Sequence, residues 1–193
     1  MIEEFKIYVV NLKRDNERRK NIINEIEKQN IKNYEIIDAV AGDELNKNEL
    51  DSLTFKNKNN INPWNSKMSP SQIGCALSHV KIYKKFINTN SELAFILEDD
   101  AIFLEDFGIK IKNLIIKNFK YKKQIMLLSE LKEFYPKAID AGDGYEIVNV
   151  SNAFFTHGYI INKEAAKAII TKEISDIREG PFIMMVADAR LNE

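Results

Sequence analysis

Three consecutive carboxylates, Glu98, Asp99 and Asp100, follow directly on the apolar segment Leu93–Leu97. Side chains alternate along a strand, so Glu98 and Asp100 are expected on one side and Asp99 on the other. Like charges this close repel one another unless a cation, hydrogen-bond donors or water compensate them. Mg²⁺ and Mn²⁺ take oxygen ligands and often combine one or two protein carboxylates with substrate phosphates. The triplet therefore indicates a divalent-metal site that carries phosphate; the alternative is acids that cap a turn or face water.

Three arginines, Arg14, Arg18 and Arg19, lie around the start of an expected helix, which Asp15 or Asn16 can cap. Cations at a helix N-terminus oppose the helix dipole, which costs up to about 1 kcal/mol unless an anion lies there. Helix N-terminal amides together with arginine side chains form a phosphate site, so these residues are candidates for binding a diphosphate. The alternative is a solvated basic helix face offset by Glu17 and Glu25.

Ser69 begins a second helix, with Pro at the first helical position and Gln three residues after the cap. We expect this helix to run from residue 70 to about residue 89. Gly74 narrows its first turns, which allows a neighbouring backbone or a ligand to approach closely. His79 shares a face with Cys75, and it is either a hydrogen-bonded core histidine or a group at the edge of a site.

Strand-like segments position both charged groups. Lys6–Leu12 and Tyr34–Ile37 flank the helix that carries the arginines, and strand, helix, strand is the βαβ unit of a parallel sheet. The uninterrupted apolar segment Leu93–Leu97 is typical of a strand covered on both faces within such a sheet. The acids then lie at the carboxyl end of this strand, which is the edge where open α/β sheets bind ligands.

Hydrophobic periodicity and turn residues predict the secondary structure of the rest of the chain. It comprises a short helix and a long loop over 43–67, an amphipathic helix over 109–119, a buried strand over 124–129, an alternating strand over 145–150, a strand over 153–161 that pairs nearby, a helix capped by Asn162, and an apolar run over 180–188. With 193 residues and 45% hydrophobic content, we expect one α/β domain.

The composition excludes several classes. A net charge of -1 gives no basic field for nucleic acid. The single cysteine excludes an internal disulfide and a multi-cysteine zinc cluster, which fits a reducing compartment. The first residues carry acids where a signal peptide needs cations, and nothing approaches the roughly 20 apolar residues of a membrane span. We therefore expect a cytoplasmic protein, with peripheral contact at the membrane face left open.

A receiver-type phosphoacceptor domain also holds Mg²⁺ with an Asp pair at a strand end. It needs a further Asp at a later strand end, and the segment 124–130 ends in Ser129 and Glu130 without one. No glycine-rich Rossmann or P-loop motif, no Gly-x-Ser-x-Gly elbow and no His-Glu-x-x-His pair occurs in the chain.

Several stretches, taken in order, resemble glycosyltransferase family 25, the family of bacterial lipooligosaccharide galactosyltransferases and related enzymes. The most specific part is Gly-Cys-Ala-Leu-Ser-His followed some 20 residues later by Ile-Leu-Glu-Asp-Asp. The matching stretches are residues 7–19, 73–79, 94–100 and 156–161, with Ala165 and Ala166.

The resemblance implies a GT-A-like fold, with a central, mostly parallel sheet flanked by helices and a smaller antiparallel element near the C-terminus. It implies inverting transfer from a nucleotide sugar, typically UDP-galactose, with Mn²⁺ or Mg²⁺ bound by Glu98 and Asp100. The residues that it assigns to the donor are Asn11, Arg14, Arg18, Arg19, Ser78, His79 and Asp99.

The resemblance also implies a glycan or lipid-linked glycan as acceptor, and our candidates for the base that takes the proton of its hydroxyl are Asp188 and His157. We expect a nucleotide-sugar half, 1–130, and an acceptor half, 131–193, that is short for the family. A sugar-nucleotide binder without catalytic activity is therefore the alternative function.

Overall fold

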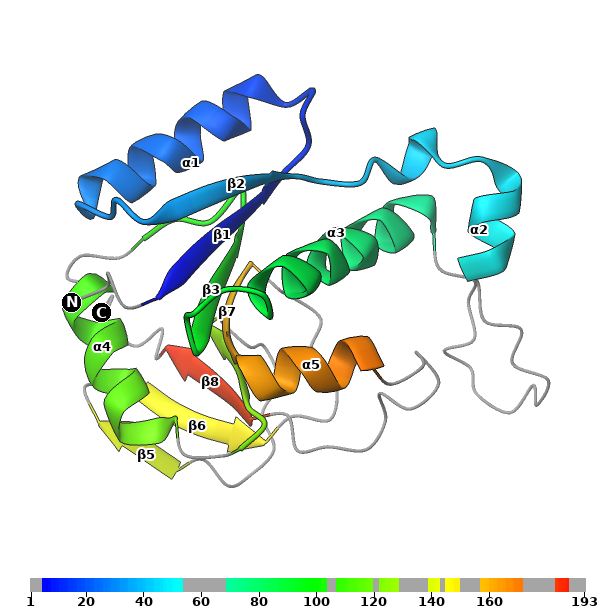
Figure 1. The fold of residues 1–193 in the computed structure, drawn as a ribbon. Helices are drawn as coiled ribbons and strands as arrows, with labels where there is room; N and C mark the ends of the chain where they lie inside the picture. Colours follow the sequence, from blue (N-terminus) through cyan, green and yellow to red (C-terminus); the bar gives the residue numbers. More distant parts are fainter. Residues whose placement is uncertain are drawn as a thin grey trace.

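The computed structural model describes residues 5–53, 69–103, 107–119, 122–128, 139–142, 145–149, 157–171 and 183–187. Helices and strands alternate along these segments (Figure 1). In chain order they are β1 (Lys6–Asn11), α1 (Asn16–Lys28), β2 (Tyr34–Asp38), η2 (Gly42–Glu44), α2 (Lys47–Leu53), α3 (Pro70–Phe86), β3 (Leu93–Glu98), α4 (Phe107–Asn118), β4 (Ile125–Leu128), β5 (Ile139–Gly142), β6 (Tyr145–Asn149), β7 (Gly158–Asn162), α5 (Lys163–Thr171) and β8 (Ile183–Ala187).

The strands of the described segments form one eight-stranded sheet in the order β2-β1-β3-β7-β4-β8-β6-β5. β1 runs parallel to both β2 and β3, and β4 runs parallel to β8. β7 is antiparallel to its neighbours β3 and β4, and β6 is antiparallel to β5 and β8. The sheet therefore draws strands from both of the predicted halves of the chain, and its antiparallel end is built near the C-terminus.

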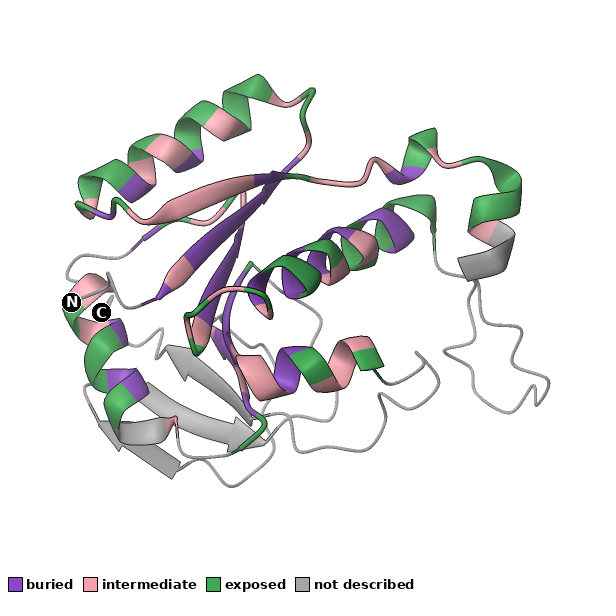
Figure 2. Ribbon diagram, viewed as in Figure 1, coloured by how far each residue is buried: buried purple, intermediate pink, exposed green. Residues whose placement is uncertain are grey.

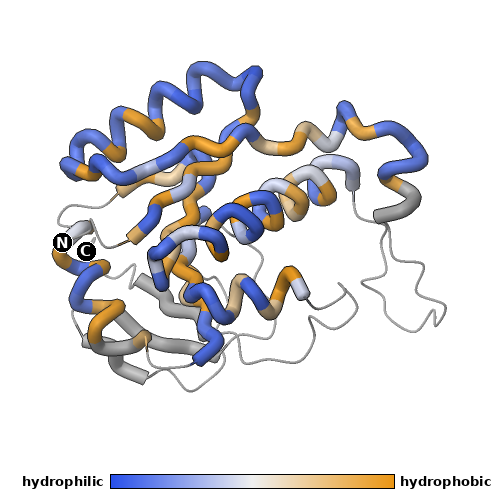
Figure 3. The backbone as a smooth tube through the Cα atoms, viewed as in Figure 1, coloured by the Kyte–Doolittle hydropathy of each residue, from blue (hydrophilic) through white to orange (hydrophobic). Residues whose placement is uncertain are grey.

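Successive side chains of the buried strands point to opposite faces of the sheet, and a hydrophobic core forms on each face. Ile7 and Val9 of β1 pack into a core that receives the apolar faces of α1 and α4. Tyr8 and Val10 point the other way, into a core shared with α3 and α5. Figure 2 shows the buried strands between these helix layers, and Figure 3 shows polar residues along the outer side of α1. The α/β fold predicted from the sequence, consistent with a GT-A-like fold, is confirmed.

Helix boundaries follow the predicted caps. The Asp15 side chain accepts a hydrogen bond from the backbone N–H of Arg18 at the start of α1. Ser69 and Gln72 form the complete capping box of α3. Asn162 Oδ1 accepts from the backbone N–H of Ala165, at 2.9 Å, at the start of α5. Each cap satisfies helix N–H groups that have no partner within the helix.

Three features differ from the sequence expectation. The segment predicted to pair near residues 145–150 instead contributes β7 between β3 and β4, and β5 was not predicted. α3 ends at Phe86 rather than near residue 89. An apolar run indicates that a strand is buried on both faces, but it does not indicate which strands lie beside it or in which direction they run.

The turn after β2 packs directly on the first turns of α3. A Cβ atom on Gly74 would lie 2.5 Å from the carbonyl oxygen of Val40, and one on Gly42 would lie 1.8 Å from that of Pro70. These glycines allow two backbones to touch, as the sequence predicted for Gly74. The contact brings residues 39–43 and the N-terminal part of α3 to the edge where β1 and β3 end.

None of the helices in the described segments combines the length and the apolar character that crossing a bilayer requires.

Candidate functional site

The acidic triplet lies where β3 leaves the sheet. Glu98 is the last residue of β3, and its backbone N–H donates to the carbonyl oxygen of His157, at 2.9 Å. The N–H of Ala101 then donates to the carbonyl oxygen of Glu98, which turns the chain at Asp99 and Asp100. Because β1, β2 and β3 are parallel, the ends of all three strands meet at this edge.

The three acids separate into two groups. One ligand atom from each of Glu98, Asp100 and His157 lies within 4.8 Å of the others. His157 Nδ1 lies 3.3 Å from Asp100 Oδ1. Asp99 instead accepts a hydrogen bond from Asn11, at 2.8 Å, at the end of β1. Glu98 and Asp100 therefore form a compact oxygen-rich cluster, while Asp99 holds the neighbouring strand end.

Asn11 is a buried polar residue, 1% exposed, at the end of β1. Its Nδ2 donates to Asp99 Oδ2 and, at 3.2 Å, to the carbonyl oxygen of Asp15. Its Oδ1 is buried without a hydrogen-bond partner in the described structure. Asn11 thereby joins β1, the cap of α1 and the acidic turn, and it still presents an acceptor atom at this edge.

The three arginines each contact carboxylates of this edge. Arg18 Nη1 lies 3.1 Å from Asp99 and 3.8 Å from Asp100. The hydrogen bond to Asp99 raises the pKa of the Arg18 guanidinium. The remaining pairs are Arg14 with Asp43 at 2.8 Å, Arg14 with Glu44 at 3.4 Å, and Arg19 with Asp38 at 3.4 Å. The basic start of α1 is thus offset by acids of other elements, which explains how this arrangement is tolerated.

The Ser78 side chain forms hydrogen bonds with backbone groups of two elements. Its Oγ accepts from the N–H of Val40 at 2.8 Å and donates to the carbonyl oxygen of Gly74 at 2.7 Å. The side chain is completely buried. Ser78 therefore fixes the turn after β2 against α3, and this turn forms one wall of the site.

His79 lies behind the acids, at the end of a buried chain of polar groups. Its Nδ1 is 2.7 Å from the Tyr159 hydroxyl, which is 2.6 Å from the Tyr83 hydroxyl. Its Nε2 is directed toward Glu98 Oε1, 3.8 Å away. Burial lowers the pKa of His79, but the neighbouring Cys75 and Glu98 outweigh this effect and raise the pKa to about 9. His79 therefore combines the two interpretations of its sequence position, because it is a core residue at the edge of the site.

A cavity of about 270 Å³ opens between the end of β1, the turn after β2 and the start of α3. We call it the α3 pocket; its polar lining comprises Arg14, Asp15, Arg18, Asp43, Ser71, Cys75, Ser78, Glu98 and Asp99. Four of these residues are carboxylates and two are arginines, so the lining carries an excess of negative charge.

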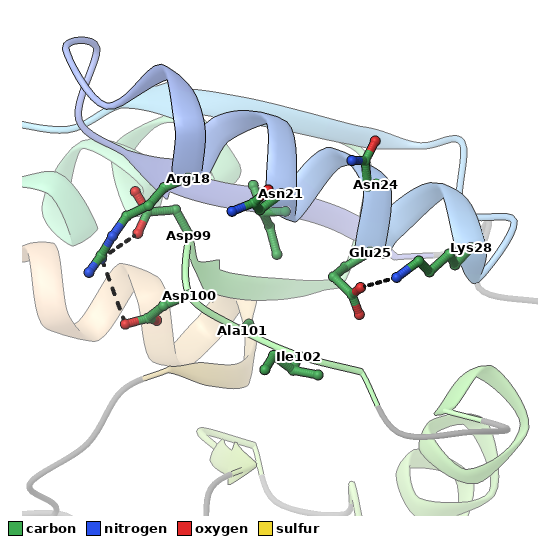
Figure 4. A pocket seen from close by; sticks show the side chains of 10 residues that line it. Arg18, Asn21, Asn24, Glu25, Lys28, Asp99, Asp100, Ala101 and Ile102 are labelled. Atoms are coloured by element: carbon green, nitrogen blue, oxygen red, sulfur yellow. Dashed lines mark hydrogen bonds and ion pairs between the residues drawn. The ribbon is translucent and has the colours of Figure 1, made fainter.

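A second cavity, of about 460 Å³, lies between α1 and the segment after β3. Figure 4 shows this α1 pocket, in which Arg18 reaches Asp99 and Asp100 at one end and Glu25 pairs with Lys28 at the other. Ile102, 82% exposed, and Asn21 line the space between them. Arg18 and Asp99 line both pockets, so their ion pair stands between the two.

The structure thus brings the predicted residues of three strand ends and two helices to one edge. Asp188 lies outside the described residues. Sequence reasoning missed Asp43 and Tyr159 as partners of site residues. The four-residue spacing of Cys75 and His79 places both on the same face of α3, but it does not indicate Asp43 or Tyr159. Nothing in the sequence near Tyr159 indicates its bond to His79.

Comparisons with known proteins match most of the chain. The family described as glycosyltransferase family 25 (LPS biosynthesis protein) matches residues 4–186. Human procollagen galactosyltransferase 2 is 29% identical over 174 residues, covering 86% of this chain and 27% of the relative. A Drosophila melanogaster glycosyltransferase 25 family member is 26% identical over 195 residues, covering 97% of this chain and 31% of the relative. The chain therefore spans less than a third of the length of these relatives.

Proposed function

The chain belongs to glycosyltransferase family 25, and on that premise we propose that it transfers a hexose, galactose in the first instance, from a UDP-sugar to a glycan acceptor. The proposed transfer is inverting and depends on Mn²⁺ or Mg²⁺. The donor binds in the α3 pocket, with its diphosphate at the meeting point of Arg18 and the acidic turn.

The charge balance of the α3 pocket is the observation that supports metal dependence. Four carboxylates and two guanidinium groups line it, so an anionic diphosphate alone would add to an existing negative excess. A divalent cation compensates both the carboxylates and the phosphates. The site is therefore suited to a metal diphosphate rather than to a free diphosphate.

Glu98 and Asp100 are the proposed metal ligands. One ligand atom from each of them and from His157 lies within 4.8 Å of the others, and an oxygen-rich set of this kind fits Mn²⁺ or Mg²⁺ together with phosphate oxygens. When bound, such an ion supplies charge neutralisation for the departing diphosphate.

The chain's own residues position the donor on the other side. Arg18 is cationic, and its exposed guanidinium exchanges part of its contact with Asp99 and Asp100 for phosphate oxygens. Arg14, which pairs with Asp43, likewise exchanges part of that contact for phosphate oxygens. Arg19 lies further along α1 and pairs with Asp38. Ser78 contributes by holding the turn that forms the pocket wall.

In the proposed reaction, an acceptor hydroxyl oxygen bonds to the anomeric carbon while the bond from that carbon to the diphosphate oxygen breaks. UDP leaves, and the hydroxyl proton passes to a base. His157 is the proposed base among the described residues, since Asp100 contacts its Nδ1 and orients the ring. Asp188, the second candidate from the sequence, keeps that role as a prediction.

The acceptor is proposed from the family and the relatives. The family description names LPS biosynthesis, and the human relative is named a procollagen galactosyltransferase. We assign a lipooligosaccharide or another glycan as the acceptor. Action at the cytoplasmic face of a membrane, through peripheral contact with a lipid-linked glycan, is part of the same proposal.

Calorimetric titration of UDP and UDP-galactose, with and without Mn²⁺, tests this proposal. We expect UDP to bind only with Mn²⁺ and Asp100→Asn to weaken that binding at least tenfold, because one ligand of the cation is lost. Glu164→Gln is the matched control, since it also converts a carboxylate to an amide, and its carboxylate pairs with Lys167 on α5, which begins beside Leu93 at the opposite end of β3. It should retain the affinity of the original chain.

Unchanged affinity and unchanged metal dependence in a folded Asp100→Asn variant would remove the metal assignment. A chain that binds UDP with Mn²⁺ but neither hydrolyses UDP-galactose nor transfers galactose to glycan acceptors would instead support a sugar-nucleotide binder without catalytic activity.

A further inference from the structure

Three side chains of different chemistry converge beside the α3 pocket, and two of them, Cys75 and Glu98, line it. One ligand atom from each of Cys75, His79 and Glu98 lies within 4.8 Å of the others. Cys75 and His79 are one helical turn apart on α3, whereas Glu98 ends β3, so two elements of the fold build this cluster. The transfer steps proposed above give no role to the Cys75 thiol, and His79 is assigned to the donor by the family resemblance alone.

The imidazole of His79 is already oriented as a metal ligand would be. His79 is 7% exposed, and its Nε2 is buried without a hydrogen-bond partner among the described residues. Its other ring nitrogen, Nδ1, lies 2.7 Å from the Tyr159 hydroxyl. Metal-binding histidines commonly engage one ring nitrogen with a second polar group, which fixes the ring and directs the other nitrogen at the ion.

The partner of the imidazole is itself fixed. The Tyr159 hydroxyl lies 2.6 Å from the Tyr83 hydroxyl, and both tyrosines are buried in the core between the sheet and α3. The Tyr159 ring also lies 5.5 Å, centroid to centroid, from the His79 ring. Rotation of the imidazole away from Cys75 and Glu98 would therefore break a buried network.

We propose that Cys75 Sγ, His79 Nε2 and a Glu98 carboxylate oxygen bind a borderline-soft divalent ion, Zn²⁺ being the type case. Tetrahedral zinc with bonds of about 2.0 to 2.3 Å separates its ligand atoms by about 3.3 to 3.6 Å. The distance from His79 Nε2 to Glu98 Oε1, 3.8 Å, is close to this value. The thiol is on the exposed side of the cluster and lines the pocket, so the ion enters from there and keeps one open position toward it.

Ligand chemistry distinguishes this site from the proposed diphosphate-metal site. Thiolate and imidazole select zinc-type ions, whereas carboxylates and phosphates select Mn²⁺ or Mg²⁺. Glu98 belongs to both sets of ligands. Zn²⁺ at Cys75 and His79 therefore competes with the hard ion for one carboxylate, and it opposes metal-dependent donor binding.

Titration of the metal-free chain with Co²⁺, followed by displacement with Zn²⁺, tests the site without any nucleotide. Co²⁺ bound to a thiolate gives a charge-transfer absorption, and Cys75 is the only cysteine of the chain. We expect this band at one ion per chain and its loss in Cys75→Ser, with Zn²⁺ affinity at least tenfold weaker. Tyr159→Phe should keep the band and bind Zn²⁺ about 10- to 100-fold more weakly.

A control variant separates the cluster from an accessible thiol. Ser71 lines the same pocket one turn earlier in α3, so Cys75→Ser combined with Ser71→Cys moves the thiol away from His79. This double variant should not restore the band at one ion per chain. Absence of the band in the original chain, equal Zn²⁺ affinity in Cys75→Ser, or one ion per two chains would overturn the proposal. Failure of UDP binding would leave it standing, because the assay contains no donor.

Discussion

Replacing Gly74 by alanine places two physical effects of opposite sign in competition. In a helix interior, alanine is favoured over glycine by about 1 kcal/mol, so helix propensity alone predicts a more stable protein. The added Cβ, however, would lie 2.5 Å from the carbonyl oxygen of Val40 and 2.7 Å from the backbone nitrogen of Gly42. Both are backbone atoms, which no side-chain rotation can remove.

Overpacking of this kind costs about 1 to 3 kcal/mol, and the rigid partner here favours the upper part of that range. We therefore expect a net loss of about 1 to 2 kcal/mol in the free energy of unfolding. For a chain of this length, that loss lowers Tm by about 2 to 8 °C. Urea unfolding followed by circular dichroism measures the loss directly.

Ala76→Gly calibrates the propensity effect within the same helix, because Ala76 is exposed two residues further along α3. It should lose about 1 kcal/mol without a new contact. If Gly74→Ala is as stable as the original chain, or more stable, the close packing of α3 on the turn after β2 is refuted.

Three further changes test separate parts of the site and its frame. Asn11→Ala removes the 2.8 Å donor to a largely buried Asp99 and should cost about 2 kcal/mol in urea unfolding; an effect below about 0.5 kcal/mol would contradict this role. Ser69→Ala removes the capping box of α3 and should cost about 1 kcal/mol by the same measurement, whereas no change would show that the cap is dispensable. Arg18→Ala should weaken UDP binding more than uridine binding in calorimetry, and equal losses would move Arg18 away from the phosphates.

The sequence predicted the edge of the sheet at which the site lies, because that prediction needs only local patterns. The apolar segment that ends in Glu98 was correctly placed as an interior strand, and the strand, helix, strand order correctly gave the parallel arrangement of β1 and β2. The acids and the arginines were therefore assigned to one edge. Their pairing was not predicted, since Arg18 and Asp99 are 81 residues apart.

The sequence alone determined the caps at Ser69 and Asn162, the two-faced burial of the central strands and the presence of Gly74 at a close approach, and it limited the cap of α1 to Asp15 or Asn16. These features arise from interactions within a few residues or from side-chain periodicity, so short windows contain them. Only the tertiary structure decided that β7 lies between β3 and β4 and that Tyr159 meets His79. Those choices depend on which of many distant segments pack together, and the competing arrangements share the same local patterns.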